Sequence, residues 1–402
     1  MRGTVSTAGA VLCCLGLAAG CSAGAPEERG ADGESGTQSS AQHVHVLKAK
    51  VEKVHLDGDP FLHRTGHQVV AVKDDIFVMR GVEDDIATQT NTFRGDLFRL
   101  DPKHGTRARM TELRERGDAI PPDTAFHCAV GDDRRDGSLL SFGGAHFIFQ
   151  GDPGFFQSLA VFDTLWRYRV SNKRWVAIEP AGVKPAARAG CNAELHDGSM
   201  YMFGGLNRFL QLNNELWRFD TATETWTQLT PVGPIPEPRF IGATAVDHDT
   251  GKIYLYNGHR ATSSGFQSIG DFWVYDVATN AFRELPPIPA PARDEGTLTI
   301  LHSPGGKKLL VYTAGHTASP VLCTGFTEMT TALDEIWAFD PDAESWQQLD
   351  VVGDAPRLHF VRGATIRNVH YLAGGWVDVP DPVNTCHQEW SEDVYRLRLV
   401  ND

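Results

Sequence analysis

A six-fold internal repeat is the feature that most limits how this 402-residue chain can fold. Each copy contains a short core with a bulky aromatic residue, such as "ELWRFD" from Glu215 and "EIWAFD" from Glu335. The other cores are "DLFRLD" at Asp96, "TLWRYR" at Thr164, "DFWVYD" at Asp271 and "DVYRLR" at Asp393. Apolar and polar side chains alternate across each core, which is typical of a half-buried strand. Self-similarity of this kind indicates a repeat architecture in which each copy is one supersecondary unit.

Further strands are predicted on both sides of each core. Upstream, a strand ends in glycine, at Gly81, Gly144, Gly205, Gly258, Gly315 and Gly375, and glycine permits a turn at positive φ or a close backbone approach. Before it, turn sequences such as "LHDGS" and "DHDTGK" predict a hairpin with yet another strand. Downstream, a fourth strand is led by Trp175, Trp226, Phe282 or Trp346. Four antiparallel strands repeated radially form the blades of a β-propeller.

The order of these elements resembles the kelch repeat of the galactose oxidase/kelch superfamily. The resemblance is carried by "RTGHQVVAVKDDIFVMRG" and by "DGSMYMFGGLNRFLQLNNELWRFDTATETW", and it covers roughly residues 44–399. The first copy departs from the pattern, because Arg107 stands where the second aromatic residue belongs. The resemblance implies an all-β, six-bladed propeller in which the repeated tryptophans are packing residues that specify the fold.

The N-terminal part of the repeat region has a predicted role in closing the ring. The sixth copy supplies only three strands up to Asp402, while residues 43–54 alternate like a strand that has no other partner. We expect these residues to form the outer strand of the last blade and so to remove a free edge. Residues 43–402 are then one propeller domain.

Residues 1–20 have the layout of a signal peptide, and "LAAGC" resembles a bacterial lipobox. This resemblance implies that Cys21 is lipidated, and that residues 21–42, rich in Gly, Ser and acid, form a flexible linker. We therefore expect an extracytoplasmic protein held by its lipid on a bacterial membrane, at the outer membrane or cell surface. The alternative is an ordinary secretory signal that is cleaved nearby.

Four further cysteines are compatible with disulfides in an exported protein. Cys323 and Cys386 follow the second strands of copies 5 and 6, so we predict that they are bridged. Cys128 and Cys191 stand on the first strands of copies 2 and 3, where a bridge and two buried thiols are both open. The Cys and His spacing matches no zinc motif, and we expect no metal and no cofactor.

Candidate binding residues lie around the connections that follow each glycine pair. These connections are long and comprise residues 82–95, 145–163, 206–214, 259–270, 316–334 and 376–392. In an up-and-down blade they all emerge on one face, which we call the loop face. The candidates are Arg64, His67, Arg188, Arg239, His259, Arg293, His316, Arg362 and Trp376. In kelch relatives, arginines ahead of the first strand often approach the channel, where guanidinium groups suit a carboxylate. Such arginines can instead hydrogen-bond carbonyl groups between blades.

Two classes of function follow. The net charge of -14 argues against nucleic acid as a partner. We favour a monomeric recognition module whose loop face binds a protein or glycan. The alternative is an enzyme that resembles the secreted kelch sugar epimerases (mutarotases) acting on sialic acid, in which His or acid groups move protons and arginines hold the carboxylate.

Overall fold

The computed structural model describes residues 46–402 apart from 61–62, 86–89, 104, 150–155, 264, 319–329 and 380–386. These residues belong to one compact unit, His45–Asp402, and its regular elements are β-strands, as the sequence predicts. Among them, no helix has the length and apolar character needed to cross a membrane.

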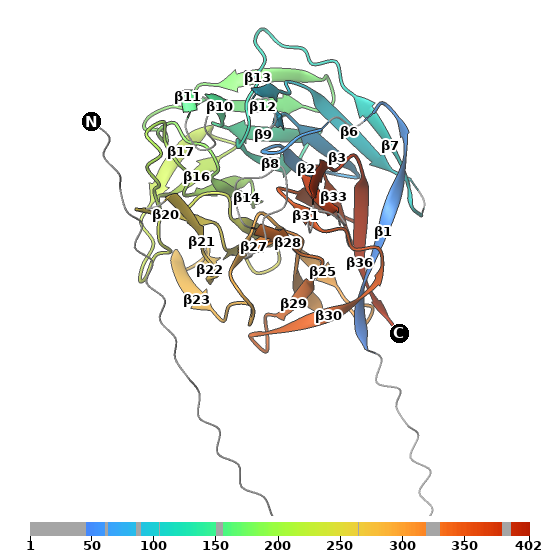
Figure 1. Ribbon diagram of the computed structural model, residues 1–402. Helices are drawn as coiled ribbons and strands as arrows, with labels where there is room; N and C mark the ends of the chain where they lie inside the picture. The colour runs from blue at the N-terminus through green and yellow to red at the C-terminus, as the bar shows by residue number, and fades with distance from the viewer. Residues whose placement is uncertain are drawn as a thin grey trace, which may run out of the picture. The chain divides into compact units, whose positions relative to one another are not determined.

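Most of the described strands group into six blades of four strands around a centre (Figure 1). Strand β1 (Leu47–Gly58) joins the sheets of three blades into one 12-stranded sheet. Blade 1 contains β2 (Gln68–Val72), β3 (Asp75–Met79), β6 (Leu97–Pro102) and β7 (Arg107–Glu112), and blade 2 contains β8 (Cys128–Asp132), β9 (Ser138–Phe142), β12 (Leu165–Arg169) and β13 (Arg174–Ile178). Blade 3 contains β14 (Asn192–His196), β15 (Ser199–Phe203), β16 (Leu216–Asp220) and β17 (Thr225–Leu229), and blade 4 contains β18 (Ala243–Asp247), β19 (Lys252–Tyr256), β22 (Phe272–Asp276) and β23 (Ala281–Leu285). Blade 5 contains β25 (Thr297–His302), β26 (Lys308–Thr313), β29 (Ile336–Asp340) and β30 (Ser345–Gly353), and blade 6 contains β32 (Arg362–Ile366), β33 (Val369–Ala373) and β36 (Val394–Asn401) together with β1 (Leu47–Gly58).

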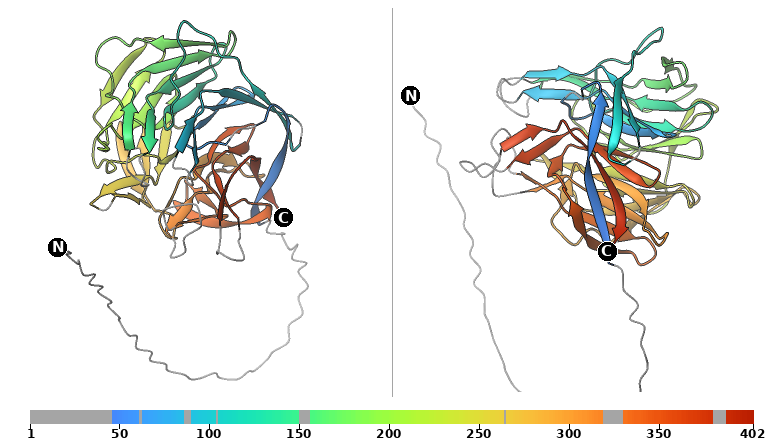
Figure 2. Two further views of the ribbon diagram at one scale, coloured as in Figure 1. Left: turned by 45° about the horizontal axis from the view of Figure 1, so that its top comes forward. Right: turned by 90° about the vertical axis from the view of Figure 1, so that its right-hand side faces the viewer.

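Strand β1 pairs with the C-terminal strand β36. The two strands are antiparallel, with Leu47 opposite Asn401 and Val54 opposite Val394. They run side by side in Figure 2, where β1 is blue and β36 is dark red. The two ends of β1 also pair in parallel with β30 and with β7. The strand predicted for residues 43–54 therefore exists, is described from Leu47, and extends to Gly58 because β7 continues the pairing.

The inner strand of each blade lies beside the inner strand of the next. The order is β2, β8, β14, β18, β25 and β32, and β32 in turn lies beside β2. Between blades, the repeated aromatic side chains interlock: Trp226 of blade 3 packs edge-on against Phe142 of blade 2. Of the tryptophans predicted to be packing residues, Trp166 and Trp346 are partly buried and pack against the core. The others are buried, namely Trp175, Trp217, Trp226, Trp273 and Trp337. Burial of large apolar side chains is the main favourable contribution to folding at these contacts.

Hairpins occupy most of the long connections that follow the glycine pairs and that the sequence indicates as loops. They are β4 (Val82–Asp85) with β5 (Thr90–Phe93), β10 (Ala145–Phe149) with β11 (Phe156–Val161), β20 (His259–Thr262) with β21 (Gly265–Ser268), β27 (His316–Ala318) with β28 (Thr330–Ala332), and β34 (Trp376–Val379) with β35 (His387–Trp390). Two short strands, β24 (Arg293–Asp294) and β31 (Leu358–His359), add to β27 and β34. The loop-face aromatic residues Phe147 and Trp376 are therefore held in strands and buried.

One disulfide joins neighbouring blades. Cys128 at the start of β8 is bonded to Cys191, just before β14, with their Cα atoms 5.6 Å apart. The sequence left open a disulfide or two buried thiols for this pair, and the structure contains the disulfide. Cys323, Cys386 and Cys21 lie outside the described residues.

Candidate functional site

Four of the candidate arginines are buried struts inside single blades. Arg64, Arg188, Arg239 and Arg293 pair with the carboxylates of Asp96, Glu215, Asp271 and Glu335, which stand immediately ahead of the third strands. In blade 4, both amino groups of Arg239 donate to Asp271, and Nη1 also donates to the Asn257 carbonyl at 3.1 Å. The indole of Trp273 donates to the same carboxylate at 2.7 Å. These guanidinium groups tie the start of the first strand to the third strand of the same blade. Their role is structural, but their partners lie within one blade and are not the carbonyl groups between blades that the sequence left open as an alternative.

His67 is also an internal residue. Its ring is fully buried, and Nε2 lies 2.9 Å from the Ala373 carbonyl, linking blade 1 to blade 6. Burial, together with the nearby Arg64 and Arg362 charges, holds the pKa of His67 well below its usual value. The ring is therefore neutral and serves as a structural link.

The other candidates border two cavities. His259, His316 and Trp376 line a cavity of about 620 Å³, which we call the loop-face cavity. Most of its wall is apolar and comes from several blades, including Phe126, Phe147, Leu159, Leu206, Leu210, Phe240, Phe266, Phe360 and Trp376. Phe266 is 44% exposed and packs edge-on against Phe240, with ring centroids 4.7 Å apart. An apolar wall with a few polar groups is typical of a ligand site.

Backbone pairing explains how these side chains meet. Ahead of each first strand, one residue pairs with the residue that starts the loop-face connection, as in Phe240 with His259, Asp294 with His316 and His359 with Trp376. The next residue then has a positive φ in every blade, at Gly66, Phe126, Gly190, Ile241, Glu295 and Phe360. For Glu295 the value is 58°, a conformation that non-glycine residues rarely adopt. Because Phe126, Ile241 and Phe360 share it, this conformation belongs to the repeat and sets the direction of the side chain in each blade.

A cluster of six ionisable side chains lies beside the loop-face cavity, between blades 4, 5 and 6. We call it the floor cluster, and its members are His259, Asp294, Glu295, His316, His359 and Asp378. Burial alone lowers the pKa of His259, but the carboxylates of Asp294 and Glu295 raise it above its usual value. Burial opposes ionisation of Asp294, yet His259 and His316 hold the pKa of its carboxyl below the usual value. The histidines and carboxylates of the cluster thus stabilise each other's charged forms although they are buried.

Sequence reasoning identified two members of this cluster, His259 and His316, and missed the other four. A signal for two of them is present: where copies 1 and 3 have Thr65-Gly66 and Ala189-Gly190, copy 5 has Asp294-Glu295. Two consecutive acids stand here at a turn position where the other five copies have no acid. His359 and Asp378 carry no comparable signal.

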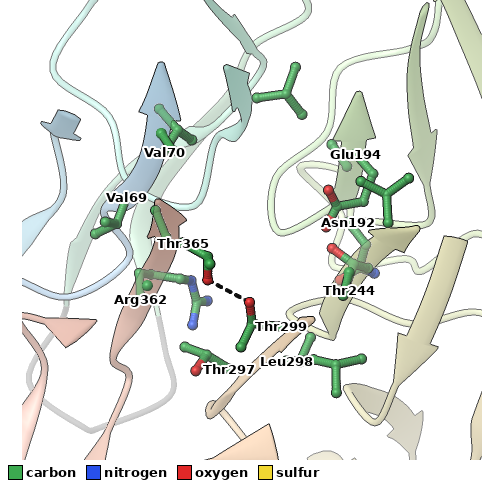
Figure 3. A pocket seen from close by; sticks show the side chains of 18 of the residues that line it. Val69, Val70, Asn192, Glu194, Thr244, Thr297, Leu298, Thr299, Arg362 and Thr365 are labelled. Carbon is green, nitrogen blue, oxygen red and sulfur yellow. Dashed lines mark hydrogen bonds between the residues drawn. The ribbon is translucent and has the colours of Figure 1, made fainter. Parts of the chain in front are cut away.

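The second cavity is the channel between the inner strands, of about 530 Å³ (Figure 3). Arg362 and Glu194 stand on opposite sides of it, and the hydroxyls of Thr299 and Thr365 lie 2.6 Å apart. Burial raises the pKa of Glu194 to about 7, although Thr244 opposes this by donating a hydrogen bond. Burial also lowers the pKa of Arg362, which Glu295 opposes. Among the five candidate arginines, Arg362 lines a cavity. The other four pair with a carboxylate of their own blade.

Comparison with known proteins places this architecture in a family. The family described as KLHDC2/KLHL20/DRC7 Kelch-repeats domain matches residues 30–258 and 211–402. Kelch domain-containing protein 10 of Xenopus tropicalis is 25% identical over 321 residues, covering 79% of this chain and 72% of the relative. The protein of the same name in Homo sapiens is 24% identical over 327 residues, covering 80% and 68%. Among solved structures, "Structure of YjhT" aligns with a TM-score of 0.57 at 15% identity, covering 83% of this chain and 99% of that one, and this likeness concerns the fold alone.

Proposed function

Because this chain belongs to the KLHDC2/KLHL20/DRC7 kelch-repeat family, we propose that it is a recognition module whose loop-face cavity binds a segment of a partner protein. The observation that carries the proposal is the largely apolar wall of this cavity, built by side chains from several blades. Buried apolar and aromatic pockets are where proteins hold the anchor residues of their partners. A protein segment with an apolar side chain suits this wall better than a glycan, since sugar hydroxyls need polar partners.

The scaffold behind this surface is proposed to be a closed ring of six blades. Its support is the pairing of β1 with β36 and the contact of β32 with β2. Closure gives the loop face a fixed geometry, because each hairpin is then held by a blade with neighbours on both sides. A rigid scaffold of this kind lowers the entropic cost of binding.

The module is further proposed to be exported and attached to a membrane through lipid on Cys21, with residues 21–42 as a flexible linker. The motif "LAAGC" supports this anchor. In this arrangement the partner is an extracytoplasmic protein, and the module acts as a monomer.

A photo-crosslinking amino acid in place of Phe266 tests the binding surface. Phe266 stands at the cavity and is 44% exposed, so the replacement leaves the core intact. The matched control is the same replacement at Val176, an exposed residue of β13 that is 38% accessible and does not line the cavity. We expect one partner protein, identified by mass spectrometry, to be crosslinked at position 266 and not at 176. Equal crosslinking at both positions, or binding of a glycan alone on an array, would refute the proposal.

A second candidate is the sugar epimerase activity, and one observation favours it. The floor cluster combines histidines and carboxylates at close range beside a cavity, an arrangement that is able to transfer protons. Incubation of N-acetylneuraminate with the full chain, with interconversion of the two anomers followed by NMR, tests it. Interconversion at the rate found in buffer alone would exclude this candidate and leave the binding module unaffected.

A further inference from the structure

Three ligand-type atoms converge in the floor cluster. Nδ1 of His316 lies 3.4 Å from Nδ1 of His359 and 3.4 Å from Oε2 of Glu295. The three residues offer atoms that all lie within 4.8 Å of one another. In a tetrahedral zinc site with bonds of about 2.0–2.1 Å, neighbouring ligand atoms are roughly 3.3–3.4 Å apart. Two of the three separations therefore already have the length that a shared zinc ion requires, and we propose that Glu295, His316 and His359 bind Zn²⁺.

The outer nitrogen atoms of both histidines face carboxylates. Nε2 of His316 lies 2.6 Å from Oδ1 of Asp294, and Nε2 of His359 lies 3.5 Å from Oδ1 of Asp378. Each carboxylate is itself held in place, since Ser268 donates to Asp294 and the Ala332 amide donates to Asp378 at 2.8 Å. Metal-binding histidines nearly always have such a carboxylate, carbonyl or water on the second nitrogen. In the tautomer with the proton on Nε2, each Nδ1 carries the lone pair that is able to bind a metal ion.

The third ligand is a buried carboxylate oxygen. Glu295 is 4% exposed, and within the described part of the chain its Oε2 accepts no hydrogen bond. Its other oxygen, Oε1, lies 3.4 Å from Nε2 of His259, which keeps Oε2 turned toward His316. A buried carboxylate oxygen without a hydrogen bond is costly, and it faces the nitrogen atoms of two imidazole rings. A cation between these atoms compensates the charge of the carboxylate and gives Oε2 of Glu295 a partner.

The ligand set selects the ion and leaves room for a further ligand. Two imidazoles and one carboxylate suit zinc, whereas calcium and magnesium prefer sites made of oxygen atoms. Glu295 and His316 both line the loop-face cavity, so the remaining coordination position opens toward it. A water molecule or an oxygen atom of a bound ligand completes the coordination there.

Calorimetry with ZnCl₂ tests the site in the full chain, purified without a histidine tag and stripped with a chelator. We expect one equivalent of zinc per chain. Glu295→Gln and His316→Gln should each weaken binding at least tenfold. Asp378→Asn should weaken it by roughly 10- to 100-fold through the orientation of His359. The matched control is His370→Gln, because His370 is a buried channel histidine that hydrogen-bonds Thr297 and Thr365. It should bind zinc like the unaltered chain.

Substitution with Co²⁺ gives a second readout that does not depend on the variants. A four-coordinate cobalt site gives strong visible absorption bands, which we expect for the unaltered chain and for His370→Gln. The proposal is overturned if the unaltered chain binds no zinc, or if Glu295→Gln and His316→Gln both bind zinc as tightly as the unaltered chain. It is also overturned if the bound cobalt has the weak spectrum of the hexaaqua ion. Should His316→Gln fail to fold by circular dichroism, Glu295→Gln and the cobalt spectrum of the unaltered chain still decide between these outcomes.

Discussion

Replacement of Arg239 by alanine separates a structural role of the buried arginines from a role in ligand binding. The Arg239 side chain is fully buried, and its guanidinium makes two hydrogen bonds to Asp271, one to the Asn257 carbonyl and one to the Glu237 carbonyl. Truncation removes all of these bonds and leaves the half-buried Asp271 carboxylate without its counter-ion. Breaking one partner of a buried ion pair costs about 3–5 kcal/mol.

This loss should appear directly in thermal unfolding. With an average unfolding entropy of about 2 cal/mol/K per residue and a folded unit of roughly 350 residues, we expect Tm to fall by about 4–7 °C. The measurement is differential scanning calorimetry, with Arg260→Ala as control. Arg260 is 44% exposed and lies 3.5 Å from Glu237, so its truncation should change the free energy of unfolding by less than ~0.5 kcal/mol.

A double substitution checks the cause of this effect. Arg239→Met combined with Asp271→Asn removes both charges while the amide oxygen still accepts the Trp273 indole hydrogen bond. Because no unpaired charge remains, the double variant should regain about 2 kcal/mol relative to Arg239→Ala. An Arg239→Ala variant that melts like the unaltered protein and loses its partner would refute the strut interpretation and restore the arginine to the binding site.

Three further predictions concern the channel, the ring and the anchor. Burial raises the pKa of Glu194 from its usual 4.5 to about 7, so the stability associated with its neutral form is fully present below pH 4.5 and is lost as the pH rises through 7. In urea unfolding, Glu194→Gln should therefore have the same free energy of unfolding as the unaltered protein at pH 4 and a higher one, by ~1–2 kcal/mol, at pH 8. This figure is reduced from the full effect of the pKa shift because solvent in the channel screens the charge. Equal free energies of the two proteins at both pH values would contradict this prediction. Deletion of residues 43–54 removes most of β1 and should lower the free energy of unfolding by several kcal/mol. Deletion of residues 22–41 should leave it nearly unchanged. Equal melting temperatures of the two truncated chains would exclude closure by β1. Cys21→Ser should abolish incorporation of a labelled fatty acid and move the protein from the membrane fraction to the soluble fraction, and an unlabelled, membrane-bound unaltered chain would contradict lipid anchoring.

The repeat made much of the fold predictable. The alternating aromatic cores, the glycine pairs and the hairpin turns predicted four strands per copy, and the orphan strand near the N-terminus predicted a partner for β36. Local patterns suffice here because each blade is formed by consecutive strands. The hairpins on the loop face were not predicted. Their strands are short, and the connections that contain them have no sequence pattern in common between the copies.

The candidate site was less predictable because its chemistry depends on pairing between segments far apart in sequence. Asp294 meets His316 through a backbone pair inside blade 5, and His359 joins them from blade 6. The role of the arginines depended on whether a carboxylate of the same blade reaches them. The recurring acid two residues before the core tryptophan, as in Glu215 with Trp217, is the pattern that identifies such a partner.

The affinity of the partner identified by crosslinking tests the central proposal, that the loop-face cavity is the recognition site. Isothermal titration would compare the unaltered chain with Phe266→Ala and Val176→Ala, both of which should melt nearly normally because these side chains are partly exposed. An aromatic anchor at the cavity typically contributes at least ~2 kcal/mol, so Phe266→Ala should weaken binding about thirtyfold. Val176→Ala should bind like the unaltered chain. Equal affinities for all three proteins, or a loss confined to Val176→Ala, would contradict recognition at this cavity.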